Sequence, residues 1–273
     1  MFPAVAVGLD GSPESLAAVD WAAREALLRQ AELRIVHAGD QPPSDQVSFT
    51  SSSAHMLLEV RTVLMDRHPD LRVAVHQVPG PSAAALSAAA DEAGLLVLGT
   101  RGPGRAAGIL LGSVARAVVA RAGRPVVLVR ADDGATDAHT DGPLGTPSGG
   151  SPNHDVVVGL DLRDVHDAVL GLAFDAASRR AAALRVVQGR NAPADPAAVA
   201  ALRTWRERFP DVEVVEQSVI GTAGSHLADA SRDASLVVVG RRSRPASVGP
   251  HIGPVTHAVL RHAVAPVVVV PHD

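Results

Sequence analysis

The segment Ala4–Ser15 reads AVAVGLDGSPES, and a shorter form of it, VVVGLDLRD, returns at Val156–Asp164. In both, a short aliphatic run ends in Gly-Leu-Asp, which places Asp10 opposite Asp161. In the first segment Ser12 and Pro13 follow at once, and these residue types favour the N-cap and the first turn of a helix. A buried strand that turns directly into a helix is typical of a parallel α/β fold.

The repetition continues along the whole chain of 273 residues. We therefore predict two domains, 1–130 and 154–273, joined by a linker at 131–153 that is rich in Asp, Gly and Pro. The first copy is longer between Ala38 and His68, and the polar run Gln41–Ser53 is predicted to be an inserted loop. The further matches are LRIVHA (Leu33–Ala38) with LRVVQG (Leu184–Gly189), LLVLG (Leu95–Gly99) with LVVVG (Leu236–Gly240), and RPVVLV (Arg124–Val129) with APVVVV (Ala265–Val270).

Each copy alternates aliphatic runs with longer amphipathic stretches, which indicates a parallel sheet with right-handed crossovers. In such sheets ligands bind beyond the carboxyl ends of the strands, so we expect function in the loops after the first and fourth strands. In the first copy, strands are predicted at Ala4–Leu9, Leu33–Ala38, Leu71–Gln77, Leu95–Gly99 and Pro125–Arg130, and helices at Pro13–Gln30, Ala54–His68, Ser82–Ala93 and Ser113–Ala122.

The composition excludes several chemistries. All 25 basic residues are arginines, and the chain has no Cys or Tyr, so a Walker A lysine, a Schiff base, a thiolate nucleophile and a Cys-ligated zinc site are excluded. A net charge of −4 with 2% aromatic residues argues against a nucleic-acid partner. No apolar span or basic leader is evident, and we expect a cytoplasmic protein without a membrane partner.

The loop after the fourth strand carries the clearest functional pattern, in LGTRGPGRAAGILLGSVARAVVARAGRPVVLVR at Leu98–Arg130. Glycines let backbone amides approach anionic oxygens, and a helix that opens at Gly112-Ser113 offers donors and the positive end of its dipole. Arg101, Arg105 and Arg116 can supply positive charge. The pattern therefore indicates a phosphate ligand.

The spacing Gly99-x2-Gly102-x9-Gly112-Ser113 resembles the ATP-binding signature of the universal stress protein family. The resemblance covers both halves and points to the tandem class common in actinobacteria. It implies ATP, with or without Mg²⁺, and an adenosine contact at Asp10 and an adenine wall at Val36. The cofactor-binding residues implied for the first domain are Asp10, Val36, Gly99, Arg101, Gly102, Gly112, Ser113 and Val114.

The resemblance also implies a fold of two tandem Rossmann-like domains. Each would be a five-stranded parallel sheet of order 3-2-1-4-5 flanked by helices, with its last strand paired antiparallel across a dimer interface. Within one chain the two copies can supply that interface themselves, so we expect an intramolecular pseudo-dimer through RPVVLVR and APVVVVP, and a homodimer remains an alternative.

The second copy departs from the pattern, because Ser243 replaces the second glycine and Pro254 replaces the terminal serine. Proline removes both a hydroxyl and a backbone donor. A second, weaker site is therefore expected at Asp161, Val187, Gly240, Ser243 and Gly253.

Less specific interpretations remain for these residues. Gly112-Ser113 alone is more often a plain N-cap, and Asp10 alone is often a turn residue. The spacings between His251, His257 and His262 match no metal-binding helix pair, so no metal site is predicted. No catalytic residues are predicted either, and three functions stay open: an ATP-binding stress-response regulator, a slow ATPase or adenylyl- or phosphoryl-transfer enzyme, and a nucleotide-independent scaffold.

Overall fold

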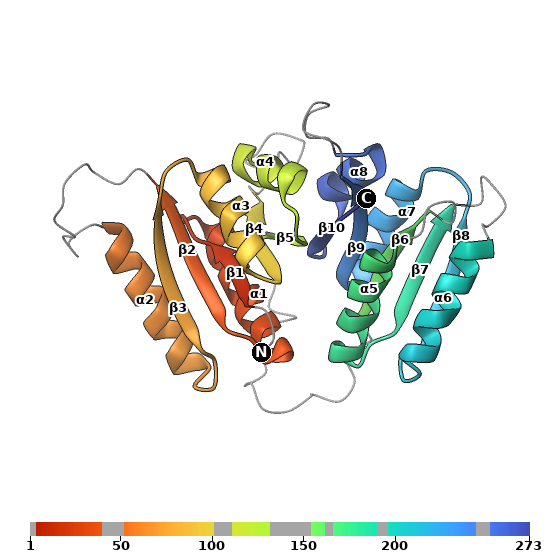
Figure 1. Ribbon diagram of the computed structural model, residues 1–273, viewed down its shortest axis with the longest axis horizontal. Helices are drawn as coiled ribbons and strands as arrows, with labels where there is room; N and C mark the ends of the chain where they lie inside the picture. The colour runs from red at the N-terminus through yellow and green to blue at the C-terminus, as the bar shows by residue number, and fades with distance from the viewer. Residues whose placement is uncertain are drawn as a thin grey trace.

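The computed structural model describes residues 4–39, 52–100, 111–131, 154–161, 166–189, 196–243 and 252–273. They form one ten-stranded sheet of order β3-β2-β1-β4-β5-β10-β9-β6-β7-β8 (Figure 1). The strands are β1 (Val5–Gly8), β2 (Leu33–Gly39), β3 (Val73–Pro79), β4 (Leu95–Thr100), β5 (Val126–Arg130), β6 (Asp155–Leu160), β7 (Leu184–Gly189), β8 (Val214–Val219), β9 (Ala234–Arg242) and β10 (Val267–His272).

Helices alternate with the strands, as the sequence predicts. Ser12 accepts a hydrogen bond from the Ser15 amide as the N-cap of the first helix, and Pro13 stands in its first turn. The helices are α1 (Pro13–Arg29), α2 (Ser52–Arg67), α3 (Ser82–Glu92), α4 (Ser113–Arg121), α5 (Asp167–Arg180), α6 (Pro196–Arg208), α7 (Ala223–Ala230), the 3-10 turn η1 (Ser231–Asp233) and α8 (Pro254–His262).

Each half of the sheet has the strand order 3-2-1-4-5, which confirms the fold class. The repeat is also visible in the backbone. Gln30 and Ala181, which follow α1 and α5, both adopt the left-handed conformation, and so do Gly80 and Gly221, which follow β3 and β8. Several predicted boundaries differ from the structure by one or two residues: β3 begins at Val73 and not at Leu71, because the Leu71 amide still donates to the His68 carbonyl at 3.0 Å, and α2 begins at Ser52 and not at Ala54. The predicted inserted loop therefore ends before Ser52; its remaining residues, and the linker from residue 132 to residue 153, lie outside the described residues.

The two halves meet at β5 and β10, the two runs expected to pair. These strands are antiparallel, with Val268 opposite Val127. Arginine side chains add hydrogen bonds across the junction: Arg130 donates to the Leu260 carbonyl at 3.2 Å, and Arg241 donates to the Ala122 carbonyl at 2.6 Å. Both carbonyls lie at helix C-termini, where a cation is favourable.

Successive strand residues feed two cores on opposite faces of the sheet. Val5 and Val7 of β1 belong to one core, to which α1, α2, α5 and α6 also contribute side chains, whereas Ala6 belongs to the other, to which α3, α4, α7 and α8 contribute. Both faces are therefore covered, which explains why the strands read as continuous aliphatic runs. Phe174 of α5 is the largest fully buried side chain in the part of the chain that the structure describes.

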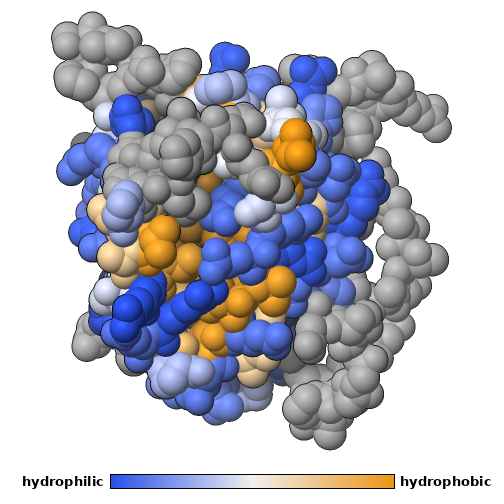
Figure 2. Space-filling model, turned by 90° about the vertical axis from the view of Figure 1, so that its right-hand side faces the viewer, coloured by the Kyte–Doolittle hydropathy of each residue, from blue (hydrophilic) through white to orange (hydrophobic). Residues whose placement is uncertain are grey.

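The outer edges of the sheet are β3 and β8. Figure 2 views the end of the molecule that carries β8 and α6, where apolar side chains gather among hydrophilic ones. Val215 on β8 is 43% exposed, and the neighbouring Glu216 pairs with Arg206 of α6 at 2.7 Å. Charged side chains of this kind oppose pairing with another edge.

No helix in the described ranges has the combination of length and apolar character needed to cross a bilayer.

Candidate functional site

The carboxyl ends of β1 and β4 lie side by side at one edge of the first half, because the two strands are directly paired and parallel. Asp10 lies in the loop after β1, with an exposed side chain. Its Oδ1 accepts a hydrogen bond from the Ser12 amide at 3.0 Å and another from the Ser12 hydroxyl at 2.6 Å. The carboxylate is therefore held in one orientation at the carboxyl end of the sheet, where ligands bind in this class of fold.

Hydrogen bonding also tunes the charge of Asp10. Partial burial alone would raise the pKa of its carboxyl. The hydrogen bonds from Ser12 and Ser15 together lower it by more, so the net pKa lies below the ordinary value. Asp10 is thus ionised at neutral pH. It can accept hydrogen bonds from a ligand, but it is a weak general base because its conjugate acid is strong.

Val36 lies on β2 directly beside Gly8 of β1 and is 4% exposed. The next residue, His37, makes a 2.8 Å hydrogen bond between its Nδ1 and the Leu9 carbonyl. This contact ties the end of β2 to the residue before Asp10. Val36 itself accepts a hydrogen bond from the Leu9 amide at 2.9 Å, so it lies next to the residue that precedes Asp10.

Gly99 has a packing role that the sequence did not reveal. A Cβ built at Gly99 would lie 2.5 Å from the backbone carbon and oxygen of Glu14 in α1. Only a residue without a side chain lets β4 and α1 approach this closely. Gly99 is therefore required by the fold whether or not a ligand is bound.

The last helix of the first half begins as the sequence predicts. Gly112 is the N-cap of α4 and provides no side-chain cap, and Ser113 is the first helical residue. Val114 is 37% exposed. An N-terminus capped by glycine can offer its first-turn amides and the Ser113 hydroxyl to an anion. Arg101, Gly102 and Arg105 lie outside the described residues.

In the second half a cavity of about 680 Å³ opens at the carboxyl ends of the strands. Asp161 and Gly240 line it, together with Pro254 at the start of α8. The cavity thus lies at the carboxyl ends of β6 and β9, which are paired and parallel like β1 and β4. The volume is within the range of about 300–1,000 Å³ usual for small-molecule sites.

The other three residues expected at the second site lie at different places in the second half. Val187 is buried at 1% exposure on β7, at the position equivalent to Val36. The Ser243 amide donates to the His272 carbonyl at 2.6 Å. Gly253 is the N-cap of α8, and a Cβ placed there would meet no atom within 4 Å. None of Val187, Ser243 and Gly253 is among the residues that line the cavity.

Two histidines in the cavity wall were not expected from the sequence. The rings of His166 and His272 stack with centroids 3.7 Å apart and planes at 23°. A Cβ at Gly240 would lie 2.8 Å from Nε2 of His272, so the missing side chain of Gly240 makes room for the ring. Burial lowers the pKa of His272, and the charges of His166, Arg242 and Arg241 lower it further, although a hydrogen bond from its Nδ1 to the Asp273 carbonyl opposes them.

Three more polar residues of the cavity wall were missed. Thr222 follows β8, Arg242 ends β9, and Thr256 lies in α8, where its hydroxyl donates to the Gly240 carbonyl at 2.9 Å. Arg242 was within reach of sequence reasoning, because it is the counterpart of Arg101 in the repeat. The loop after the third strand, which contains Thr222, has no sequence pattern that would have predicted its place in the cavity wall.

The chain matches the family model described as the universal stress protein family over residues 1–130 and 192–271. It is 32% identical over 299 residues to universal stress protein Rv2005c of Mycobacterium tuberculosis, covering 97% of this chain and 96% of the relative. Universal stress protein Rv2623 of the same organism is 29% identical over 296 residues, covering 97% and 95%.

Among solved structures, the chain resembles the crystal structure of a universal stress protein from Archaeoglobus fulgidus. The TM-score is 0.73 at 19% identity, with 99% of this chain and 98% of that chain covered. This likeness supports the fold. Because the family model spans most of the chain and the relatives match it end to end, the protein belongs to the universal stress protein family.

Proposed function

We propose that this protein is an ATP-binding regulator of the stress response, with nucleotide held mainly in the first half. The observation that carries the proposal is the fixed, ionised Asp10 at the carboxyl end of β1, the strand that pairs with β4, together with the glycine-capped N-terminus of α4. A carboxylate suits ribose hydroxyls, and a glycine-capped helix start suits phosphate oxygens.

Each residue of the proposed first site has a distinct role. Asp10 accepts hydrogen bonds from the ribose, and Val36 backs the adenine ring. Ser113 and Val114 offer amides at the start of α4 to the phosphates, while Gly112 leaves the approach open. Arg101 and Gly102 are proposed to cover the phosphates, and Gly99 fixes the strand from which their loop departs. ATP is expected with or without Mg²⁺.

The second half is proposed to hold nucleotide more weakly. Its cavity is large enough for an adenosine moiety, and Asp161 lines it as the counterpart of Asp10. Phosphate binding is poorer, because Pro254 lacks an amide hydrogen and a hydroxyl where Ser113 has both. The rings of His166 and His272 also occupy part of the cavity wall.

We propose that the regulatory output depends on nucleotide occupancy and not on rapid turnover. Asp10 is a weak base, since its pKa is lowered. A residue of this kind binds a ligand firmly but accelerates proton transfer little. Slow hydrolysis is the most that we expect from the first site.

We further propose that the chain is a pseudo-dimer of two domains, 1–130 and 154–273, joined by a linker at 131–153. The antiparallel pairing of β5 with β10 and the two arginine contacts across it support this arrangement. Pairing in this way removes an open edge from each half. A cytoplasmic location would give the protein access to ATP.

The direct test is acid extraction of gently purified protein followed by chromatography of the released nucleotide. We expect close to one ATP per chain, and calorimetry of the stripped protein should show rebinding. An extract free of nucleotide, together with no heat of binding, would favour a nucleotide-independent scaffold. ATP loss faster than about one turnover per minute would favour an enzyme, since it exceeds what a binding site alone gives.

A further inference from the structure

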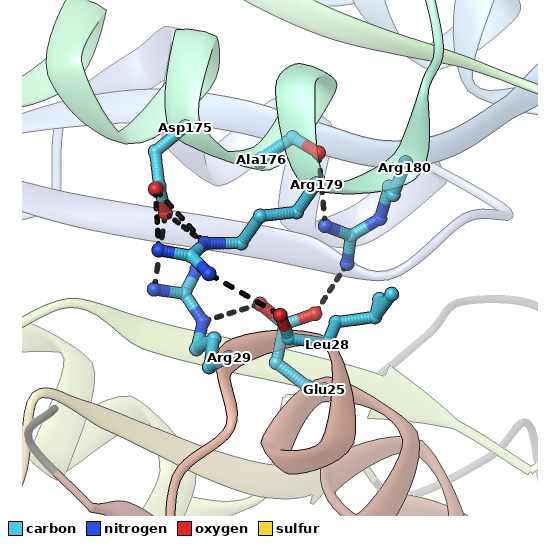
Figure 3. Close-up of polar contacts among 7 residues, drawn as sticks. All are labelled: Glu25, Leu28, Arg29, Asp175, Ala176, Arg179 and Arg180. Atoms are coloured by element: carbon cyan, nitrogen blue, oxygen red, sulfur yellow. Dashed lines mark hydrogen bonds and ion pairs between the residues drawn. The ribbon is translucent and has the colours of Figure 1, made fainter.

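Helices α1 and α5 approach each other at the centre of one face of the sheet, and a charged network joins them (Figure 3). Arg29 donates from Nε to Oε1 of Glu25 at 2.6 Å, and Arg180 donates from Nη2 to Oε2 of the same carboxylate at 2.5 Å. The two oxygens of Glu25 thus each receive one arginine, one from either half of the chain.

A second carboxylate completes the network. Asp175 of α5 contacts Arg29 at 3.3 Å and Arg179 at 2.9 Å. The hydrogen bond to Asp175 raises the pKa of Arg179, partial burial opposes this, and the charges of Asp175 and Glu25 raise it further. Arg179 also donates to the Leu28 carbonyl at 3.2 Å. The ends of both helices are therefore held by ion pairs and by a contact to backbone.

The two helices can be aligned residue by residue. Gln30 and Ala181 follow α1 and α5 in the same left-handed conformation, and β2 and β7 begin at the equivalent Leu33 and Leu184. In this alignment Arg29 is the counterpart of Arg180. The counterpart of Glu25, however, is alanine, Ala176. The repeat keeps both arginines and carries the central carboxylate once.

The difference between Glu25 and Ala176 matters because these side chains are buried. The side chain of Glu25 is 1% exposed, and those of Arg29 and Arg180 are 19% and 12% exposed. Ala176 is fully buried. A buried charge is tolerated only when it is paired and hydrogen-bonded. One carboxylate shared by two arginines satisfies this condition and leaves room for only a methyl group at the equivalent position.

A pair of two first halves, or of two second halves, would not meet this condition for a buried charge. Two second halves would bring two copies of Arg180 together with Ala176 on both sides, so the buried carboxylate of Glu25 would be absent and only the two Asp175 carboxylates, each already paired with Arg179, would remain. Two first halves would bring two Glu25 carboxylates into a space that now holds one carboxylate and one methyl group. Only an unlike pair places one buried acid between one Arg29 and one Arg180.

We propose that Glu25 determines which halves pair: it makes the α1 surface of the first half specific for the α5 surface of a second half, and both kinds of like pair are disfavoured. The partner that fits this surface is thus the other half of the chain. The proposal rests on the pairing of β5 with β10 and is independent of ATP binding. Specificity of this kind needs a feature that penalises wrong pairs as well as one that stabilises the right pair.

The first test is a cycle of four full-length proteins: natural, Glu25→Ala, Ala176→Glu and the double variant. We expect each single variant to melt about 5–10 °C lower, because Glu25→Ala removes the acid that is buried between Arg29 and Arg180, and Ala176→Glu crowds two acids. The double variant moves the acid to the equivalent position, where Arg180 is four residues away and Arg29 lies across the junction. The double variant should regain at least half of the decrease in melting temperature that Glu25→Ala shows.

Glu207→Ala is the matched control, since Glu207 also pairs with an arginine four residues away, Arg203 at 3.1 Å, but both side chains are more than half exposed. Its melting temperature should stay within about 1 °C of the natural value. A double variant no more stable than Glu25→Ala would overturn the proposal. An unchanged melting temperature in Glu25→Ala would do so as well.

The second test measures the pairing itself. A protease site is inserted between Gly149 and Gly150, the folded chain is cleaved, and the product is unfolded in urea, diluted and weighed by native mass spectrometry. The natural sequence should reform unlike pairs at more than about nine-tenths, whereas Ala176→Glu should approach the statistical half. A statistical mixture for the natural sequence, or no reassociation of its halves, would overturn the proposal, whatever the result of nucleotide extraction.

Discussion

The hydroxyl of Ser12 donates a hydrogen bond of 2.6 Å to Oδ1 of Asp10. The same hydroxyl oxygen accepts from the Ser15 amide at 3.2 Å as the N-cap of α1. One serine therefore starts the helix and orients the proposed ligand contact. The carboxylate can be removed without removing the cap, so binding and folding can be tested separately at this position.

We expect Asp10→Ala to weaken ATP binding about 10- to 100-fold, since one or two hydrogen bonds to a charged group are worth about 1–3 kcal/mol. The melting temperature should change little, because Asp10 is exposed and Ser12 still caps α1. Calorimetric titration of the folded variant measures the affinity. Asp20→Ala is the control, as Asp20 is an exposed residue of α1 whose ion pair with Arg67 spans 3.7 Å. Natural affinity in Asp10→Ala would assign Asp10 to the turn alone.

Gly99→Ala should destabilise the protein in the absence of any ligand. Its Cβ would meet the Glu14 backbone at 2.5 Å, and forcing apart packed elements costs about 1–3 kcal/mol. Gly253→Ala is the matched control, because nothing lies within 4 Å of its Cβ and its φ of −63° suits alanine. Denaturant unfolding of the nucleotide-free proteins compares them. Equal stabilities would mean that α1 yields easily and that the glycine serves another purpose.

His272 should make stability depend on pH. Burial lowers the pKa of His272 in the folded protein, so the unfolded chain takes up the proton first. The stability associated with neutral His272 is therefore present above its unfolded pKa of about 6.5 and declines as the pH falls from there toward the folded pKa. His272→Gln should flatten this part of the profile. Melting curves between pH 5 and pH 8, about the range in which histidine titrates, measure it, and identical slopes for the two proteins would contradict the assignment.

The sequence predicts elements well where local signals agree. Ser12 and Pro13 locate the start of α1 correctly, and Gly112-Ser113 locates that of α4. The sequence does not predict contacts between segments that lie far apart along the chain. His166 and His272 come from opposite ends of the second half and meet only because β10 and the loop before α5 reach the same edge of the sheet. Neither the spacing nor the composition reveals such a pair, because a stacked contact leaves no periodic pattern.

The contacts of Glu25 illustrate the same limit. An arginine four residues later predicts an ordinary helical ion pair, and Arg29 indeed forms one. The ion pair between Glu25 and Arg180 depends on the antiparallel pairing of β5 with β10, which brings α1 and α5 together. The repeat shows that Arg29 and Arg180 are equivalent, but only the structure shows that they meet at one carboxylate.

The last prediction is asymmetry between the halves: one tightly held ATP per chain, bound in the first half. Ser113 offers a hydroxyl and an amide where Pro254 offers neither, and Gly102 has no side chain where Ser243 has one. Each lost charge-assisted hydrogen bond to phosphate costs on the order of 1.5–3 kcal/mol, so two losses weaken binding by roughly a hundredfold or more.

Gly102→Val combined with Ser113→Pro should therefore abolish retained nucleotide while the protein still melts cooperatively. The reverse pair, Ser243→Gly with Pro254→Ser, should strengthen the second site in an otherwise natural chain. Calorimetric stoichiometry of the stripped proteins distinguishes the sites. Two equal sites per natural chain would refute the asymmetry, and would mean that contacts around Asp161, in the cavity of the second half, compensate for the missing phosphate donors.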